Sequence, residues 1–239
     1  MPQLIAIDNQ KHLNLKIDAS KAELHGSNLH LVPAVVSEFI NMAVQYPLVI
    51  TKHADTGEFV FAAMLGFEAG ENLFWRDEQW QGLYLPLQIR RQPFFVSSSN
   101  KDANGDDYAV CFDSNSPAIS QEGAQSLYDE TGEESQYFQQ AKSYLAQLLR
   151  GESENKYLLN LLEKMKLLQV MKMEVTFGNQ QTTTLNGLYT IDQEKLANLP
   201  TENISQLHGS ELLQPIYTLI TSLGQMHNLI DLKNKKLGC

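Results

Sequence analysis

The chain has 239 residues, of which 28 are acidic and 18 are basic, giving a formal net charge of −10. This length can bury a sizeable core without disulfides, while the acidic balance argues against nucleic-acid binding, which needs clustered Lys and Arg. No window approaches eighteen apolar residues, so the sequence predicts no membrane span.

The cysteines and the first residues bear on the cellular compartment. Cys111 lies in an apolar stretch and Cys239 is the last residue, so both are expected to be free thiols, which favours a reducing compartment. The opening MPQLIAIDNQKHLNL has no basic region followed by an apolar run, so no secretory signal is expected. We therefore expect a cytoplasmic protein.

The first part of the chain predicts short strands, one helix and a hairpin. Residues 3–7 and 13–17 have the β-branched content of short strands. Pro33 is expected to begin an amphipathic helix that continues to about Tyr46. PLVITKH and EFVFAAMLGF, joined by ADTG, then predict an antiparallel hairpin over 47–67, and its apolar content suggests a central position in a sheet.

The middle of the chain predicts two strands and a long connection. A strand begins at Phe94 and stops at a polar, glycine-containing loop over 97–107, after which YAVCFD (108–113) forms another strand. The segment 114–135 is acidic and lacks periodicity, as an interdomain connection or a flap would.

The last part is mainly helical. Ser135 is expected to cap a helix that ends at Gly151, and a second helix is expected from about Glu154 to Leu168. Residues 171–191 predict a second hairpin around a turn at Gly178. The remaining expected features are Asp192 as the N-cap of a short helix, a helix start in NLPTENISQLHG, and a final helix from about Glu211 to Leu232 with Pro215 in its first turn.

These elements predict an α+β fold, with a largely antiparallel sheet in the N-terminal half and helices plus a β-hairpin in the C-terminal half. The chain is expected to consist of a strand-rich region at 1–120 and a helical region with one hairpin at 121–239. The two regions are expected to pack as a single domain.

The stretch from Gly66 to Phe95 has the most unusual composition and is the expected binding region. Gly70-Glu71-Asn72 is typical of a turn in which Gly takes positive φ and Asn bonds to the backbone; alternatively, Glu71 and Asn72 project into a cleft and contact a ligand. The nearby aromatic residues form either an amphipathic platform for a ligand or ordinary core, and they are Trp75, Trp80 and Tyr84.

Arg90 and Arg91 precede Pro93, where an extended chain would point neighbouring side chains to opposite faces. One arginine can then reach a carboxylate in a buried ion pair, or it can capture a ligand carboxylate or phosphate. The candidate carboxylates are Glu38, Glu71 and Asp113.

Several kinds of chemistry have no signature here. The six histidines lack metal-ligand spacing, and there is no P-loop, no GxGxxG after a strand and no GxSxG elbow. We therefore expect no metal site, no cofactor and no catalytic residue set. Cys111 is interpreted as an inert buried thiol, because no basic neighbour in the sequence activates it.

A combination of motifs nevertheless resembles the SapC family of bacterial proteins, from about residue 10 to residue 230. The residues that carry the resemblance are Glu38-Phe39, Tyr46-Pro47, Gly70 to Phe74, Trp80, Tyr84, Pro86, Arg90-Arg91, Pro93-Phe94, Asp113, Ser116-Pro117, Leu127, Asp129, Gly132, Gly187 and Ser222-Leu223. The family is named for association with a bacterial surface layer. Its members often occur beside flavin-dependent halogenase-like proteins, cupin-like proteins and outer-membrane receptors, which implies an accessory role without defining a reaction.

The leading hypothesis is therefore a non-enzymatic accessory or binding protein of a bacterial surface or nutrient-uptake system, whose partner can be a halogenase-like or cupin-like protein. The expected contact residues are Glu71, Asn72, Trp80, Tyr84, Arg90, Arg91 and Asp113. The alternative is an enzyme that modifies a peptide or glycan, with Glu71 or Asp113 as acid or base.

Overall fold

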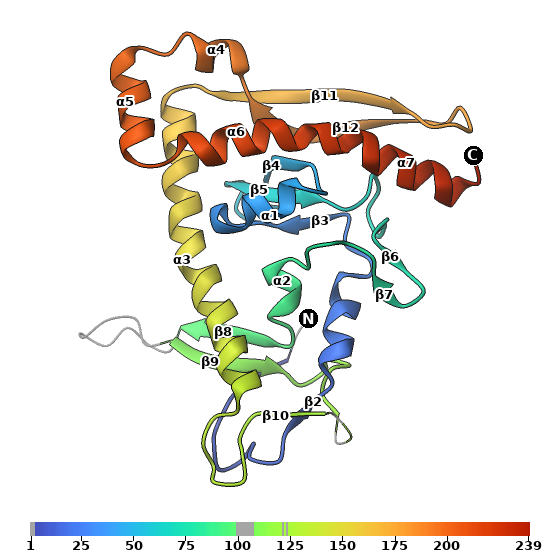
Figure 1. The fold of residues 1–239 in the computed structure, drawn as a ribbon, viewed down its shortest axis with the longest axis vertical. Coiled ribbons are helices and arrows are strands. Elements are labelled where there is room, and N and C mark those ends of the chain that lie inside the picture. Colours follow the sequence, from blue (N-terminus) through green and yellow to red (C-terminus); the bar gives the residue numbers. More distant parts are fainter. Residues whose placement is uncertain (1–2, 99–107, 121, 123) are drawn as a thin grey trace. The chain divides into compact units, whose positions relative to one another are not determined.

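The structure is a computed structural model that describes residues 3–98, 108–120, 122 and 124–239 (Figure 1). The chain forms two compact units: unit 1 comprises residues 1–27 and 87–149, and unit 2 comprises residues 28–86 and 150–239. Each unit combines segments from both sides of residue 120. Antiparallel sheets and several helices make this an α+β protein, as predicted.

Unit 1 contains a three-stranded antiparallel sheet in the order β1-β9-β8 and a small pair of strands, β10 and β2. Aromatic and aliphatic side chains from these strands and from the start of α3 form its core, including Phe94, Phe112 and Phe138. Its elements are β1 (Leu4–Ala6), β2 (Lys16–Ile17), the 3-10 helix η1 (Ala19–Gly26), α2 (Leu87–Arg90), β8 (Phe94–Ser98), β9 (Tyr108–Asp113), β10 (Gln125–Ser126) and the first half of α3 (Gln136–Lys164).

Unit 2 contains a five-stranded antiparallel sheet in the order β11-β12-β4-β5-β3. The strands are β3 (Leu31–Pro33), β4 (Leu48–Lys52), β5 (Phe59–Met64), β11 (Leu168–Thr176) and β12 (Thr182–Ile191), and a separate ribbon pairs β6 (Trp75–Arg76) with β7 (Gln79–Trp80). The helices are η2 (Val36–Glu38), α1 (Phe39–Ala43), α4 (Gln193–Ala197), α5 (Thr201–Gly209), α6 (Leu213–Ser222), η3 (Leu223–Gln225) and α7 (Met226–Leu237), together with the second half of α3.

Both predicted hairpins are confirmed, and together they build most of this sheet. β4 pairs with β5 from Leu48–Ala63 to Lys52–Phe59, in the central position that the apolar sequence favoured. β11 pairs with β12 along almost their whole length, and Figure 1 shows this long hairpin with α6 and α7 running beside it. The predicted caps are also present, since Asp192 accepts from the Lys195 N–H and Ser135 accepts from the Phe138 N–H.

The predicted helix from Pro33 to Tyr46 is wrong in extent. Pro33 ends β3 and pairs with Ala62, and only a 3-10 turn and the five residues of α1 are helical. β3 is an edge strand of the sheet, where a residue without an N–H donor is tolerated. The proline therefore belongs to the strand and does not begin the helix.

The two helices expected on either side of Gly151 are a single helix, α3, that ends at Lys164. Gly151 does not take positive φ, so it does not terminate the helix. A Cβ at this position would lie 2.5 Å from Cβ of Val35, which shows that the glycine allows close packing. The expected final helix is likewise divided, because η3 separates α6 from α7, and it continues to Leu237.

The loop expected at 97–107 falls mostly outside the described residues, because the described part of β8 ends at Ser98 and β9 begins at Tyr108. Cys111 is buried in β9 and Cys239 is exposed, and both are free thiols. Within the described ranges, no helix combines the length and apolar character that crossing a bilayer requires.

Candidate functional site

The residues predicted to bind a partner belong to two different units. Glu71, Asn72, Trp80 and Tyr84 lie in unit 2, whereas Arg90, Arg91 and Asp113 lie in unit 1. The expected binding region from Gly66 to Phe95 is thus divided after Pro86, and each group of residues is described within its own unit.

The Gly-Glu-Asn turn has the predicted local structure. Gly70 takes a φ of 83°, which favours glycine, and the Asn72 side chain accepts a hydrogen bond of 2.8 Å from the Phe74 N–H. A Cβ at Gly66 would collide with the carbonyl oxygen of Glu71. Two glycines therefore allow this loop to fold closely enough to bury Glu71.

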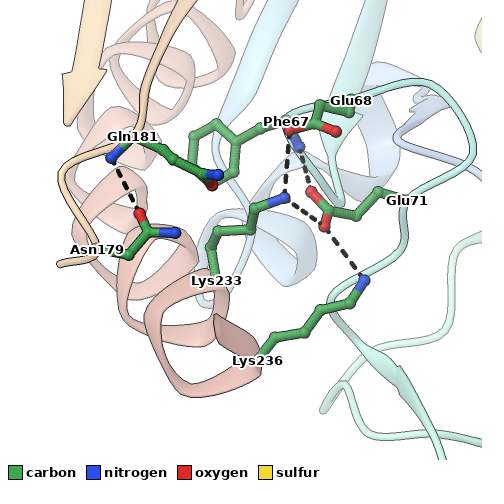
Figure 2. A network of polar contacts seen from close by, with 7 residues as sticks. All are labelled: Phe67, Glu68, Glu71, Asn179, Gln181, Lys233 and Lys236. Carbon is green, nitrogen blue, oxygen red and sulfur yellow. Dashed lines mark hydrogen bonds and ion pairs between the residues drawn. The ribbon is translucent and has the colours of Figure 1, made fainter. Parts of the chain in front are cut away.

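Glu71 is only 8% exposed and binds lysines of α7 (Figure 2). Its Oε1 accepts from Nζ of Lys233 at 2.8 Å and from Nζ of Lys236 at 3.2 Å, while Oε2 accepts from the Phe67 N–H at 3.2 Å. Lys233 also lies 3.3 Å from Glu68. The lysines are about 160 positions from Glu71 in the sequence, so the pairing depends on tertiary structure.

The electrostatics of this network hold both buried groups in their charged forms. Burial opposes the ionisation of Glu71, but hydrogen bonds from Lys233, the Phe67 N–H and Lys236 outweigh it and lower the pKa of the carboxyl group. Burial likewise lowers the pKa of Lys233, but its bond to Glu71 outweighs that effect and the net pKa is raised. Glu71 is therefore a poor proton donor at neutral pH.

Contacts made by Lys233 and its neighbour Asn234 connect α7 to the β11–β12 turn. Nζ of Lys233 lies 5.6 Å from the centre of the Phe177 ring, and Phe177 makes an edge-to-face contact with Phe67. The Asn234 side chain accepts from the Gly178 N–H at 2.9 Å. Figure 2 shows Asn179 and Gln181 of the same turn, where the Gln181 N–H donates to Asn179. The ion pair, the cation–π contact and the hydrogen bond from Gly178 to Asn234 together join three separate segments of unit 2.

The aromatic residues of the candidate region are organised around the fully buried Tyr46. Its hydroxyl donates to the carbonyl of Tyr84 at 2.6 Å and accepts from Nε1 of Trp80 at 3.1 Å. The hydroxyl of Tyr84 donates in turn to Oε1 of Glu38, which is 1% exposed. These contacts use the polar groups of Trp80 and Tyr84 inside the protein, so this part of the predicted platform has a structural role.

A small cavity lies beside the predicted residue Asn72. It has a volume of about 190 Å³ and is bordered by β6 and α7. Three of its lining residues are cations (Arg76, Lys235 and Lys236), and the lining includes no carboxylate residue from the part of the chain that the structure describes. The remaining lining residues are Asn72, Leu73, Trp75 and Leu232.

The arginines of unit 1 do not have the expected geometry. Leu87–Arg90 form the helix α2, so Arg90 is helical and not extended. A proline restricts the residue immediately before it, here Gln92, and leaves positions 90 and 91 free to turn. Arg91 donates to the Phe94 carbonyl at 2.7 Å and to Gln88 at 2.8 Å, and its guanidinium lies 4.1 Å from the Phe95 ring centre. The guanidinium of Arg90 lies 6.0 Å from the Tyr144 ring centre.

Asp113 is a buried acceptor of backbone hydrogen bonds. Its Oδ1 binds the Gln3 N–H at 2.9 Å and the Asn115 N–H at 3.1 Å. Nearby, Nε2 of His25 lies 2.9 Å from the hydroxyl of Ser116. Burial is the main cause that lowers the pKa of His25, with Asp113 opposing it. These contacts hold Gln3 and η1 against the end of β9 and the turn that follows it, within unit 1.

The chain was compared with known protein families, curated proteins and solved structures. The sequence model of the SapC family matches residues 7–229, which is nearly the whole chain. The protein belongs to the SapC family. No curated protein and no solved structure matches this SapC chain significantly.

The cations of the small cavity are functional candidates that sequence reasoning missed. Lys235 and Lys236 were recognisable only as favourable charges at a helix C-terminus, and Arg76 had no distinguishing pattern. The available signal was the set of basic residues near the end of an acidic chain. Their position beside Trp75 follows from the packing of α7 and is not visible in the sequence.

Proposed function

We propose that this SapC-family protein is an accessory binding protein that captures an anionic group of its ligand or partner in the cavity beside Asn72 and Trp75. The observation that carries the proposal is the lining of that cavity, where the described residues include three cations and no carboxylate, in a chain of net charge −10. Such a local excess of positive charge attracts a carboxylate or phosphate.

The charges of the cavity are available to a ligand to different degrees. Lys236 already binds Glu71, whereas Arg76 and Lys235 make no ion pair with any residue that the structure describes. Both of these side chains are exposed. Arg76 presents a planar, bidentate donor and Lys235 a compact charge, a combination suited to one anionic group.

The apolar residues of the cavity lining indicate which kind of chemical group is attached to the bound anion. Leu73, the indole of Trp75 and Leu232 border the same cavity. A volume of about 190 Å³ admits one small group and not a whole large ligand. The preferred occupant is therefore an anionic group attached to an apolar or aromatic body, such as an acidic side chain in an apolar segment of a partner protein.

The carboxylates considered for acid–base chemistry have contacts that favour a binding role. Glu71 is held ionised by two lysines, and Asp113 is engaged by two backbone N–H groups. The wider setting in this proposal is a bacterial surface or nutrient-uptake system, with a halogenase-like or cupin-like protein as partner. The proposal also places the protein in the reducing cytoplasm, because both cysteines are free thiols.

The test is capture of the native partner from the source cell by the tagged protein and by two charge-matched variants. Arg76→Ala/Lys235→Ala removes the two cavity cations that make no ion pair with a described residue. Lys164→Ala/Lys172→Ala removes two exposed charges outside the cavity. The partner should be lost from the first variant and retained by the second. Equal recovery with both variants would contradict the proposal.

A second measurement examines the anion directly. In a Trp80→Phe background Trp75 is the only tryptophan, so its fluorescence reports on the cavity. Citrate and inorganic phosphate should change this fluorescence at millimolar concentrations, and the change should be absent after Arg76→Ala/Lys235→Ala. A response that survives this double substitution would place the anion elsewhere.

A further inference from the structure

A groove in unit 2, separate from the anion cavity, has the properties of a second binding site. Its volume is about 480 Å³, within the range of small-molecule pockets. One wall is the end of the β4–β5 hairpin, and the other is one face of α3. The lining residues are Lys52, Gly57, Glu58, Phe59, Val60, Glu152, Asn155, Lys156, Leu159, Asn160 and Glu163.

The helical wall is a regular stripe held in a fixed position. Its residues recur at intervals of three and four from Glu152 to Glu163, which spans about 16 Å at roughly 1.5 Å per residue. The Asn155 side chain accepts from the Val36 N–H at 2.9 Å and donates to the Ala34 carbonyl at 2.8 Å. These bonds fasten the stripe to the segment after β3, so the wall is preorganised.

The groove carries charges of both signs that the described chain does not pair. Lys52 and Lys156 are positive, three glutamates are negative, and all five are exposed. None of them makes an ion pair with a residue that the structure describes. A ligand with both an ammonium and a carboxylate group would supply a partner for each sign.

The floor of the groove is apolar, and its aromatic ring is already occupied. Val60 is half-buried and Leu159 is buried. Nζ of Lys52 lies 5.3 Å from the centre of the Phe59 ring, and Tyr189 contacts the same ring edge-to-face with centroids 4.9 Å apart. The ring therefore offers little free face for stacking of a sugar, whereas it can still contact an aliphatic side chain.

We propose that this groove binds a short zwitterionic peptide in an extended conformation. A stripe of about 16 Å matches roughly five residues at about 3.3 Å each. The lysines and glutamates bind the charged groups of the peptide, the exposed amide of Asn160 bonds to its backbone, and the apolar floor receives its aliphatic side chains. The site and its ligand are independent of the anion cavity and of its partner.

The experiment is NMR titration of protein labelled at Val and Leu methyl groups. The probes are pools of pentapeptides with free termini, each peptide containing one Lys, one Glu and aliphatic residues. The resonances of Val60 and Leu159 should shift and saturate at a dissociation constant on the order of 1 mM or below. The same peptides with blocked termini and with Ala in place of Lys and Glu should bind at least about tenfold more weakly.

Matched variants separate occupancy of the groove from unspecific binding. Asn160→Trp fills the groove from an exposed helical position, and Glu154→Trp adds the same side chain to an exposed position of α3 outside the lining. Urea unfolding midpoints establish that both variants are folded. Binding should be lost only in Asn160→Trp. The proposal is overturned if no pool shifts Val60 and Leu159, if binding persists in Asn160→Trp, or if maltose shifts these methyls while the peptides do not.

Discussion

The carboxylate of Glu71 and the ammonium of Lys233 lie 2.8 Å apart, and neither side chain is more than 9% exposed. The pair connects the loop after β5 to α7, which also provides two cations of the proposed anion cavity. The arrangement of that cavity therefore depends on a buried ion pair between segments that are far apart in the sequence.

Replacing Lys233 should be strongly destabilising, because the buried Glu71 carboxylate then keeps the exposed Lys236 and the Phe67 N–H as partners but loses its buried cation. We expect Lys233→Ala to lower the free energy of unfolding by about 3 kcal/mol or more. Lys236→Ala should cost less than about 1 kcal/mol, since the Lys236 side chain is 57% exposed. Urea unfolding followed by circular dichroism measures the free energy of unfolding of both variants. Equal losses would show that the buried Lys233 stabilises the fold no more than the exposed Lys236.

The same pair predicts a dependence of stability on pH. The pKa of Glu71 in the folded protein is below its ordinary value of 4.5, so the contribution of its carboxylate is present above that pH and is lost as pH falls through the lowered folded pKa. The pKa of Lys233 is raised from 10.5, so its contribution is present below that pH and is lost as pH rises through the raised pKa.

Glu71→Gln removes the acid-side titration and should flatten the decline of unfolding free energy below pH 4.5. The measurement is a series of urea unfolding curves in acidic buffers. Glu163→Gln is the control, because Glu163 is exposed and makes no ion pair with a described residue. If the unfolding free energy of both variants falls with decreasing pH as steeply as that of the wild type, Glu71 does not contribute to acid unfolding.

Gly151→Ala should reverse the usual effect of alanine in a helix. Alanine normally stabilises a helix interior by about 1 kcal/mol relative to glycine. At position 151 the added Cβ meets Val35 at 2.5 Å, so we expect a loss of about 1 to 3 kcal/mol. Gly209→Ala is the control at the end of α5, where no described residue beyond the chain neighbours and the helix's own backbone lies within 4 Å of the added Cβ. A gain of stability in Gly151→Ala would disprove the close contact.

Tyr46→Phe should loosen the ribbon that contains Trp80. The substitution removes an acceptor from Nε1 of Trp80 and a donor from the carbonyl of Tyr84, at a cost of about 1 to 3 kcal/mol. Tryptophan fluorescence should shift to longer wavelength as Trp80 gains contact with water. Tyr217→Phe makes the same change at an exposed residue and should alter neither stability nor fluorescence.

The two thiols should react at different rates in the native protein. Burial raises the pKa of Cys111, which lowers its thiolate fraction, whereas Cys239 is exposed. Iodoacetamide should modify Cys239 at least about tenfold faster, and mass spectrometry of the digested protein measures the two rates. Similar rates would mean that Cys111 is accessible.

Much of the local structure followed from the sequence. The β4–β5 and β11–β12 hairpins have strongly apolar or alternating strands around turn residues, and Asp192 caps its helix as predicted. Two of the errors came from Pro33 and Gly151, because a proline and a glycine each fit two different structures. A proline is tolerated at a helix start and on an edge strand, and a glycine can end a helix or allow close packing within one.

The α+β class, the two hairpins and membership of the SapC family could all be predicted from the amino-acid sequence. These features depend on residue patterns within short segments and on sequence motifs. In contrast, the pairing of Glu71 with Lys233 and the shared cavity of Arg76 and Lys235 are visible only in the folded chain. Such contacts join residues about 160 positions apart, and no local pattern specifies which distant helix will supply the charge that a buried carboxylate requires.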